Sequence, residues 1–211
     1  MTMPQVRGIV FDLDGTLVDS RLDFDAMRRD MGLAAGVPIL EAMAAIPPGP
    51  EYDRMYEIVH RHELQGADLA EPFAGVLDFL QHVNELGIAS AILTRNSRES
   101  ALRTLNRWNL TFSQVIARED APPKPDPAGV LLIAERWGMG PDEMIVIGDY
   151  LFDLQAGRRA GMRSVLFAPD ELPDFVGEAD YVLRHFRDAA QLLKDLDKQD
   201  LSKQDLGKEA P

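Results

Sequence analysis

Residues 6–18, VRGIVFDLDGTLV, decide the fold of this chain of 211 residues. The run at residues 6–11 is short, apolar and rich in β-branched side chains, which predicts a buried strand. Asp12 and Asp14 follow this run directly, and Gly15 comes immediately after them. The glycine indicates a turn where the strand ends. The two carboxylates are therefore expected to diverge around a common point at the edge of a sheet.

Five more short apolar runs follow and alternate with helical patterns. Strands are predicted at residues 88–93, 114–117, 144–147, 163–167 and 180–183, and helices at about 75–86, 98–108, 128–137 and 153–160. This alternation is typical of an α/β fold, with a parallel, Rossmann-like sheet covered by helices on both faces. Ligands bind such sheets outside the carboxyl ends of the strands. Asp12, Thr94 and Asp149 all stand at those ends.

The segment from residue 18 to residue 72 breaks the alternation. It has helical patterns at about 22–31, 38–46 and 52–65, a Pro-Pro-Gly-Pro break at residues 47–50, and no clear strand. We predict an α/β core formed by residues 1–17 and 73–193, with a small helical cap, residues 18–72, inserted after the first strand. Residues 194–211 are charged and poor in apolar side chains, which predicts a frayed helix or a disordered tail.

The composition excludes several classes of function. The chain has no cysteine, so disulfides and cysteine-ligated zinc are impossible. Its net charge of −13 argues against nucleic acid as a partner, because binding to a phosphate backbone needs a basic surface. No apolar run approaches the roughly 20 residues that cross a bilayer, and the first residues lack the features of a signal peptide. We therefore expect a cytoplasmic protein with no membrane partner; the oligomeric state stays open.

The Asp12 and Asp14 pair suits two kinds of chemistry. Like charges this close repel each other unless a cation lies between them or one carboxyl is protonated. Mg²⁺ takes carboxylate oxygens as ligands and can bridge them to a phosphate, whereas a protonated carboxyl can act as a general acid. A lone aspartate is more often a turn residue or a helix N-cap. Here the sequence Asp-x-Asp-Gly-Thr directly after a buried strand favours function.

Two further motifs could bind an anion. Thr94 precedes Arg95 and Asn96 at the start of a predicted helix, where a hydroxyl and exposed backbone N–H groups can hold an anion. On its own Thr94 is more simply explained as an ST-motif or a helix N-cap. Lys124 is the only lysine in the first 193 residues and lies in a proline-rich loop. Its compact charge suits a phosphate or carboxylate oxygen, although most lysines are ordinary surface residues.

Two more acids follow the strand predicted at residues 144–147. Asp149 comes directly after Gly148, and Asp153 lies four residues further on. Asp153 alone could be an acid favoured by the positive end of a helix dipole. Each of the later motifs is weak evidence by itself. Their common placement after successive strands indicates one active site.

This series of motifs resembles that of the haloacid dehalogenase-type hydrolases, specifically the phosphoglycolate-phosphatase-like group with a helical cap after the first motif. The resemblance covers about residues 6–190. It implies that Asp12 is the nucleophile and forms an aspartyl-phosphate. It also implies that Asp14 protonates the leaving oxygen and then activates water. An acid at the position of Asp14 further implies phosphate esters as substrates, because dehalogenating and phosphonate-cleaving members lack it.

The resemblance also implies roles for the anion-binding motifs. Thr94, with Arg95, Asn96 and the backbone beyond it, would bind the phosphoryl oxygens. Lys124 would offset the negative charge on Asp12 and on the phosphoryl group. Phosphoryl transfer needs such in-line positioning and positive charge around the equatorial oxygens.

The implied cofactor is Mg²⁺. Its ligands would be Asp12, the main-chain carbonyl of Asp14, and Asp149, with Asp153 in support. The sequence departs from the family pattern at Tyr150, where many relatives have a small hydroxyl residue. The cap is also shorter than in typical phosphoglycolate phosphatases, which weakens any transfer of the substrate.

We expect a Mg²⁺-dependent phosphatase for a small phosphorylated metabolite, and three alternatives stay open. A phosphomutase shares the motifs and differs in how its cap shields the aspartyl-phosphate from water. A signalling receiver domain also uses an aspartate, a threonine and a lysine, but it has no use for a cap or for Asp14. An idle member kept as a binding module would not need the intact motifs.

Seven basic or imidazole side chains of the predicted cap could face the site, and none is singled out: Arg21, Arg28, Arg29, Arg54, His60, Arg61 and His62.

Overall fold

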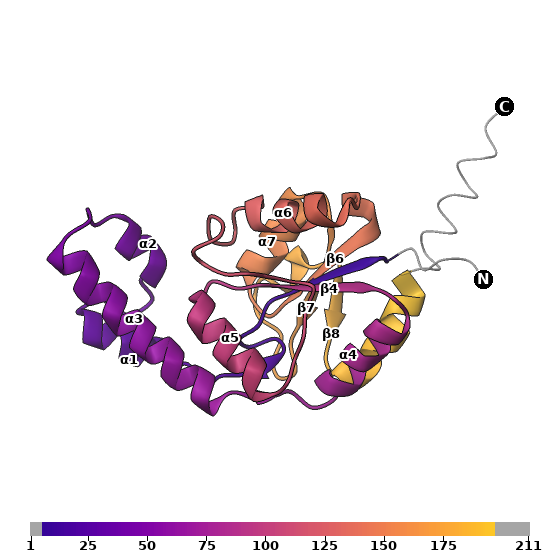
Figure 1. Cartoon of the computed structure of the whole chain (residues 1–211), viewed down its shortest axis with the longest axis horizontal. Coiled ribbons are helices and arrows are strands. Elements are labelled where there is room, and N and C mark those ends of the chain that lie inside the picture. The colour runs from indigo at the N-terminus through magenta and orange to yellow at the C-terminus, as the bar shows by residue number, and fades with distance from the viewer. Residues whose placement is uncertain (1–5, 197–211) are drawn as a thin grey trace.

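The computed structural model describes residues 6–196 and has a six-stranded parallel sheet at its centre (Figure 1). The strand order is β5-β4-β1-β6-β7-β8. The strands are β1 (Gly8–Phe11), β4 (Ala89–Leu93), β5 (Gln114–Ile116), β6 (Met144–Gly148), β7 (Arg163–Phe167) and β8 (Tyr181–Leu183). All six strands expected from the sequence are present, and the prediction of a parallel α/β sheet is confirmed.

Helices cover both faces of the sheet because β1 alternates its side chains between two apolar clusters. Ile9 and Phe11 belong to one cluster and Val10 to the other. The first cluster includes side chains of α4 (Val76–Glu85), α5 (Arg98–Arg107) and the helical residues 189–196; the second includes side chains of α6 (Ala128–Trp137) and α7 (Leu151–Arg159). Figure 1 shows these two layers on opposite sides of the sheet. Within residues 6–196, no helix is both long enough and apolar enough to span a bilayer.

The register of the sheet aligns the polar residues that follow its strands. Phe11 lies level with Ile92 of β4 and with Ile147 of β6. Asp12 then continues this arrangement, because its backbone N–H donates to the Ile147 carbonyl at 2.9 Å. The residues after β1, β4 and β6 therefore meet at one edge of the sheet.

Short 3₁₀ helices and a terminal helix complete the core. The 3₁₀ helices are Pro141–Glu143, Val176–Glu178 and Phe186–Asp188. The last one leads into helical residues 189–196, where Leu196 is fully buried in the first apolar cluster. The helix thus includes the first three residues of the predicted tail, 194–196. The rest of that predicted tail, residues 197–211, lies outside the described residues.

Three helices inserted after β1 stand to one side of the sheet (Figure 1). They are α1 (Phe24–Met31), α2 (Ile39–Ala44) and α3 (Pro50–Leu69), and their apolar side chains form a separate cluster around residues such as Met27, Met43 and Val59. This separate core supports the proposal that residues 18–72 form a cap. The C-terminal half of α3, however, leaves the cap and packs against α5 of the core.

A short antiparallel pair of strands joins the cap to the core. β2 (Val18–Asp19) pairs with β3 (Glu71–Pro72), so the insertion leaves and re-enters the core at one point. The sequence analysis predicted no strand here. Two-residue strands carry no alternating pattern, and the proline in β3 argued against a strand. α3 is also longer at both ends than predicted. It begins at Pro50, which occupies the first helical turn, where its missing N–H is tolerated.

Candidate active site

A tight turn after β1 presents Asp12 and Asp14 at the edge of the sheet. Gly15 has a φ of 83°, a left-handed conformation that favours glycine. Its N–H donates to the Val18 carbonyl at 2.8 Å, which closes the turn. A Cβ atom at this position would lie 2.3 Å from Oδ2 of Asp149. The glycine therefore lets the turn approach the end of β6 closely.

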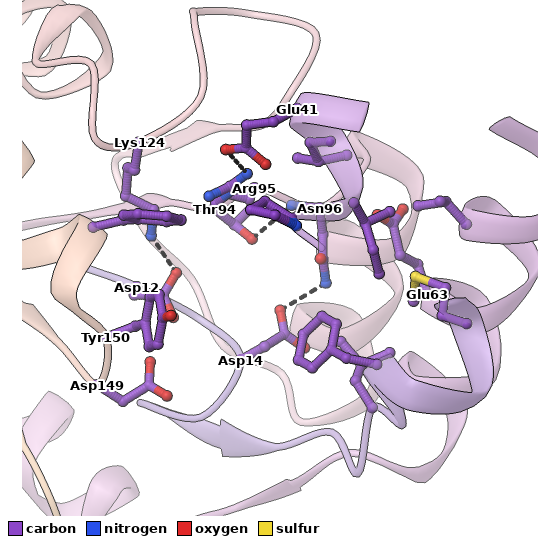
Figure 2. Close-up of a pocket in the computed structure, with 18 of the residues that line it drawn as sticks. Asp12, Asp14, Glu41, Glu63, Thr94, Arg95, Asn96, Lys124, Asp149 and Tyr150 are labelled. Carbon is purple, nitrogen blue, oxygen red and sulfur yellow. Dashed lines mark hydrogen bonds and ion pairs between the residues drawn. The ribbon is translucent and has the colours of Figure 1, made fainter. Parts of the chain in front are cut away.

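Lys124 holds two of the predicted acids together. Its side chain is buried, and its ammonium donates to Oδ1 of Asp12 and, at 2.5 Å, to Oδ1 of Asp153. Figure 2 shows the contact with Asp12. Burial lowers the pKa of Lys124, but the two carboxylates outweigh this effect and raise it above its ordinary value. The lysine is therefore a fixed positive charge beside Asp12.

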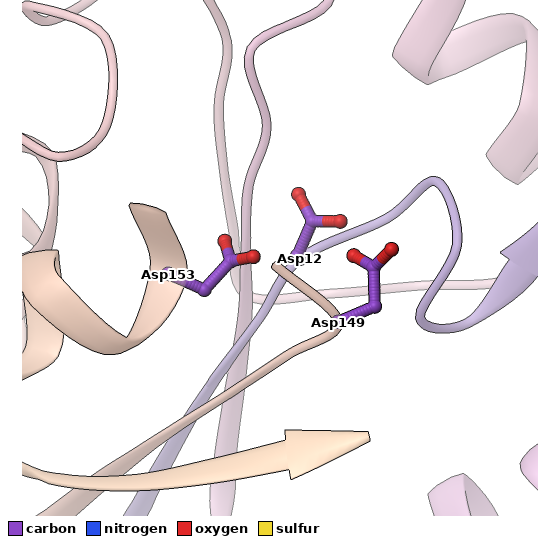
Figure 3. A group of neighbouring side chains, drawn as sticks. All are labelled: Asp12, Asp149 and Asp153. Carbon is purple, nitrogen blue, oxygen red and sulfur yellow. The ribbon is translucent and has the colours of Figure 1, made fainter. Parts of the chain in front are cut away.

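Three carboxylates form a group that fits a divalent metal ion. Asp12, Asp149 and Asp153 each offer one oxygen, and these oxygens lie within 4.8 Å of one another. Figure 3 shows the three side chains arriving from separate segments, the end of β1, the end of β6 and α7. Burial, and next the charge of Asp153, raises the pKa of Asp149 to about 7. Burial likewise raises the pKa of Asp12 well above its ordinary value.

The charge balance of this group explains why a cation fits it. Three acids face the single ammonium of Lys124, so full ionisation leaves the group negative. The oxygen ligands suit Mg²⁺, which prefers carboxylates and water. Thr16 adds a hydroxyl that donates to Asp149 at 3.2 Å and lies 3.4 Å from Asp12. Thr16 belongs to the first motif but was assigned no role from the sequence.

Asp14 faces a different partner from that of Asp12. Its Oδ2 accepts a hydrogen bond from Nδ2 of Asn96 at 2.7 Å (Figure 2). Its carboxylate is not one of the three grouped oxygens, so only its main-chain carbonyl remains as the ligand implied by the family resemblance. Burial raises the pKa of Asp14 to about 6. A carboxyl that keeps its proton more readily than a free aspartate is suited to general acid catalysis.

The loop after β4 contains the predicted anion-binding residues. The Thr94 side chain is buried, and its Oγ1 accepts the backbone N–H of Asn96 at 3.1 Å. Ser97, rather than Thr94, is the N-cap of α5. Thr94 is therefore not the helix N-cap, and its hydroxyl instead forms the ST-motif that was the other simple interpretation.

Arg95 of this loop contacts the cap. One terminal nitrogen donates to Oε1 of Glu41 on α2 at 2.7 Å (Figure 2). The guanidinium also lies 4.8 Å from the ring centre of Phe152. The positive charge that was predicted to bind phosphate is thus already paired with a cap carboxylate. Glu41 is a residue that the sequence analysis missed.

A buried ion pair supports the same loop from behind, and it was also missed. Glu63 of α3 is buried and accepts two hydrogen bonds from Arg118, the longer at 3.3 Å. It also accepts the backbone N–H of Ser97 at 3.1 Å, while Arg118 donates to the Arg95 carbonyl at 3.3 Å. One signal was available, because Glu63 continues an apolar stripe of α3 at positions 55, 59 and 63.

A cavity of about 340 Å³ lies between core and cap. All eight residues predicted for the site line it: Asp12, Asp14, Thr94, Arg95, Asn96, Lys124, Asp149 and Asp153. Tyr150, the departure from the family pattern, also lines it. Its backbone N–H donates to Oδ2 of Asp153 at 3.1 Å, and its ring packs against Phe152. The unusual side chain therefore leaves the backbone contact with Asp153 in place.

Of the seven basic or imidazole cap residues, Arg28 is the one that lines this cavity. His60 and His62, two positions apart on α3, contact different partners. His60 lies 3.2 Å from Glu99, whereas His62 lies 2.9 Å from Asp30. This agrees with the expectation that residues two apart on a helix do not face each other.

Comparison with known proteins places this geometry in context. Residues 25–167 match the family model described as haloacid dehalogenase-like hydrolase. A haloacid dehalogenase-like hydrolase domain-containing protein of Arabidopsis thaliana is 30% identical over 81% of this chain and 79% of its own length. The N-acetylmuramic acid 6-phosphate phosphatase of Pseudomonas aeruginosa is 27% identical over 92% of this chain and 97% of its own.

Solved structures show the same fold. The crystal structure of a predicted phosphoglycolate phosphatase from Haemophilus somnus aligns with a TM-score of 0.70 at 20% identity. The alignment covers 90% of this chain and 99% of that one. The likeness therefore includes the helical insertion as well as the sheet.

Proposed function

The chain belongs to the haloacid dehalogenase-like hydrolases, and from this premise we propose that it is a Mg²⁺-dependent phosphatase that hydrolyses a small phosphorylated metabolite through an aspartyl-phosphate on Asp12. One observation carries the proposal. Asp12, at the end of the central strand, is bound by the buried Lys124 inside a group of three carboxylates that lines the cavity between core and cap.

The first step needs an ionised Asp12. Burial alone would favour the protonated, non-nucleophilic form, and the Lys124 ammonium opposes it. A carboxylate oxygen of Asp12 forms a bond to phosphorus while the bond from phosphorus to the leaving oxygen breaks. Asp14 gives its proton to that oxygen, so the product leaves as an alcohol rather than as an alkoxide.

The second step regenerates the enzyme. Asp14, now ionised, removes a proton from a water molecule, and the water oxygen attacks phosphorus. The bond between phosphorus and Asp12 breaks and phosphate is released. The hydrogen bond from Asn96 fixes the Asp14 carboxylate on the cavity side of the turn, where it can serve both steps.

Mg²⁺ fits the donor set at this site. Asp12, Asp149 and the main-chain carbonyl of Asp14 would hold it, with Asp153 in support through its contact with Lys124. When bound, the ion supplies positive charge to the phosphoryl oxygens. From the core side, Lys124 supplies further positive charge and the Thr94 hydroxyl supplies a hydrogen-bond donor.

The experiment that tests this function is phosphate release by the full-length chain from p-nitrophenyl phosphate and from a panel of phosphorylated metabolites. Each assay is run with Mg²⁺ and with EDTA. We expect turnover with Mg²⁺ and its loss with the chelator. A folded protein that releases no phosphate from any ester under either condition would contradict the proposal and would favour a receiver domain or a binding module.

A further inference from the structure

The cap side of the cavity is mostly apolar. Its lining side chains come from the start of the insertion, from α1 and α2, and from the middle of α3: Leu22, Phe24, Met27, Pro38, Ile39, Leu40 and Val59. Phe24 is half exposed although it is large and apolar. A leaving group with an apolar face would remove this surface from water, which stabilises binding.

The cations that line the cavity are already paired. Besides Lys124, they are Arg95 and Arg28. Arg95 donates to Glu41 at 2.7 Å. Arg28 donates to Asp25 at 2.8 Å and to the Val37 carbonyl at 2.9 Å. Among the described residues that line the cavity, no arginine is therefore left over for an anionic group of the substrate.

The carboxylates of the lining strengthen this conclusion. Glu41 and Glu63 lie on the cap side, in addition to the four aspartates of the catalytic edge. An anionic leaving group would have to displace Glu41 from Arg95 or lie near these carboxylates without a free cation to balance its charge. Juxtaposed like charges are a general means of rejecting wrong partners.

We propose that the substrate is a phosphate monoester whose leaving group is uncharged and has an apolar face, and that Glu41 rejects leaving groups with a carboxylate or a second phosphate by occupying Arg95. This inference rests on the proposed phosphatase function. It separates this chain from enzymes whose substrate has a carboxylate beside the phosphate, because such a group needs a free cation in the cap.

The test compares two esters of similar shape, 4-carbamoylphenyl phosphate and 4-carboxyphenyl phosphate, with the full-length chain and Mg²⁺. Both leaving groups are activated phenols, so they differ mainly in charge. We expect kcat/KM for the neutral amide to exceed that for the carboxylate by about tenfold or more, which is about 1.4 kcal/mol.

The variant Glu41→Gln keeps the size of the side chain and removes the negative charge that neutralises Arg95. We expect it to lower the ratio of the two kcat/KM values at least about threefold. Glu41 is exposed, so folding is not at risk. The matched control is Glu57→Gln on α3, which removes the same charge from an exposed cap position outside the cavity lining and should leave the ratio unchanged.

The outcomes separate this inference from the function on which it rests. No turnover of these esters or of p-nitrophenyl phosphate would contradict the phosphatase itself. Turnover with equal or better kcat/KM for the carboxylate ester would overturn the inference and leave the phosphatase intact. Selectivity for the amide that is the same in wild type and Glu41→Gln would overturn the role of Glu41.

Discussion

Replacing Arg118 with methionine should destabilise the protein strongly, because it leaves the Glu63 carboxylate buried without its partner. The side chains of Glu63 and Arg118 are only 4% and 14% exposed. Removing one partner of such a pair typically costs about 3–5 kcal/mol. For a chain of this size that corresponds to a fall in Tm of roughly 10 °C. Urea titration and thermal unfolding, followed by circular dichroism at pH 7, measure both quantities.

Two controls make this prediction specific to burial. Arg103→Met removes an arginine from a pair with Asp68 in which the side chains are 47% and 51% exposed, and it should cost no more than about 1 kcal/mol. The double variant Glu63→Gln/Arg118→Met removes the buried charge and keeps an acceptor for the Ser97 N–H. It should recover about 2 kcal/mol or more relative to Arg118→Met alone. If Arg118→Met costs no more than Arg103→Met, or if the double variant recovers nothing, the reasoning is refuted.

Two further predictions concern the carboxylates of the site. Asp14→Asn should lower kcat/KM for alkyl phosphates far more than for p-nitrophenyl phosphate, since an activated leaving group needs little protonation. Asp149→Asn should instead raise the Mg²⁺ concentration required for all substrates alike. If the two variants show the same dependence on leaving group and on Mg²⁺, this division of roles is refuted. Because the folded state raises the pKa of Asp14 to about 6 and that of Asp149 to about 7, it binds protons more tightly than the unfolded chain. Metal-free protein should therefore lose stability as pH rises from about 4 through 7. Mg²⁺ should raise Tm more at pH 8 than at pH 5. If thermal melts in Mg²⁺ and in EDTA give the same Tm difference at both pH values, the metal site is contradicted.

The sheet could be predicted from the sequence because each of its strands is a short apolar run that ends in a polar motif. The six predicted strands differ from the observed ones by at most two residues at an end. The β2–β3 pair could not be predicted in this way. It has two residues in each strand, and its pairing of Val18 with Pro72 depends on the cap bringing distant segments together.

The site was predictable to the extent that its residues follow strands. Asp12, Thr94 and Asp149 occupy one edge because β1, β4 and β6 are adjacent and in register. The ion pairs between core and cap are different. Arg95 with Glu41 and Arg118 with Glu63 join residues 54 and 55 positions apart, so the spacing in the sequence carries no signal of their contact.

For the same reason the core side of the cavity was easier to predict than its cap side. The proposed catalytic residues lie at the edge of the sheet, whereas side chains of α1, α2 and α3 line the other side of the cavity. Which cap residues face the cavity depends on how these helices pack on one another. Nothing in the sequence therefore distinguished Glu41 from the other exposed acids of the cap.

The most direct measurement of the proposed chemistry is the site of covalent phosphorylation. Wild-type protein is mixed with Mg²⁺ and a phosphate ester that it hydrolyses, and the reaction is quenched in acid during the steady state. The intact chain and its peptides are then examined by mass spectrometry. We expect one added phosphoryl group, located on Asp12, and no such group on a folded Asp12→Asn variant that has lost turnover. A phosphoryl group on another residue, or near-wild-type kcat in Asp12→Asn, would contradict the aspartyl-phosphate mechanism.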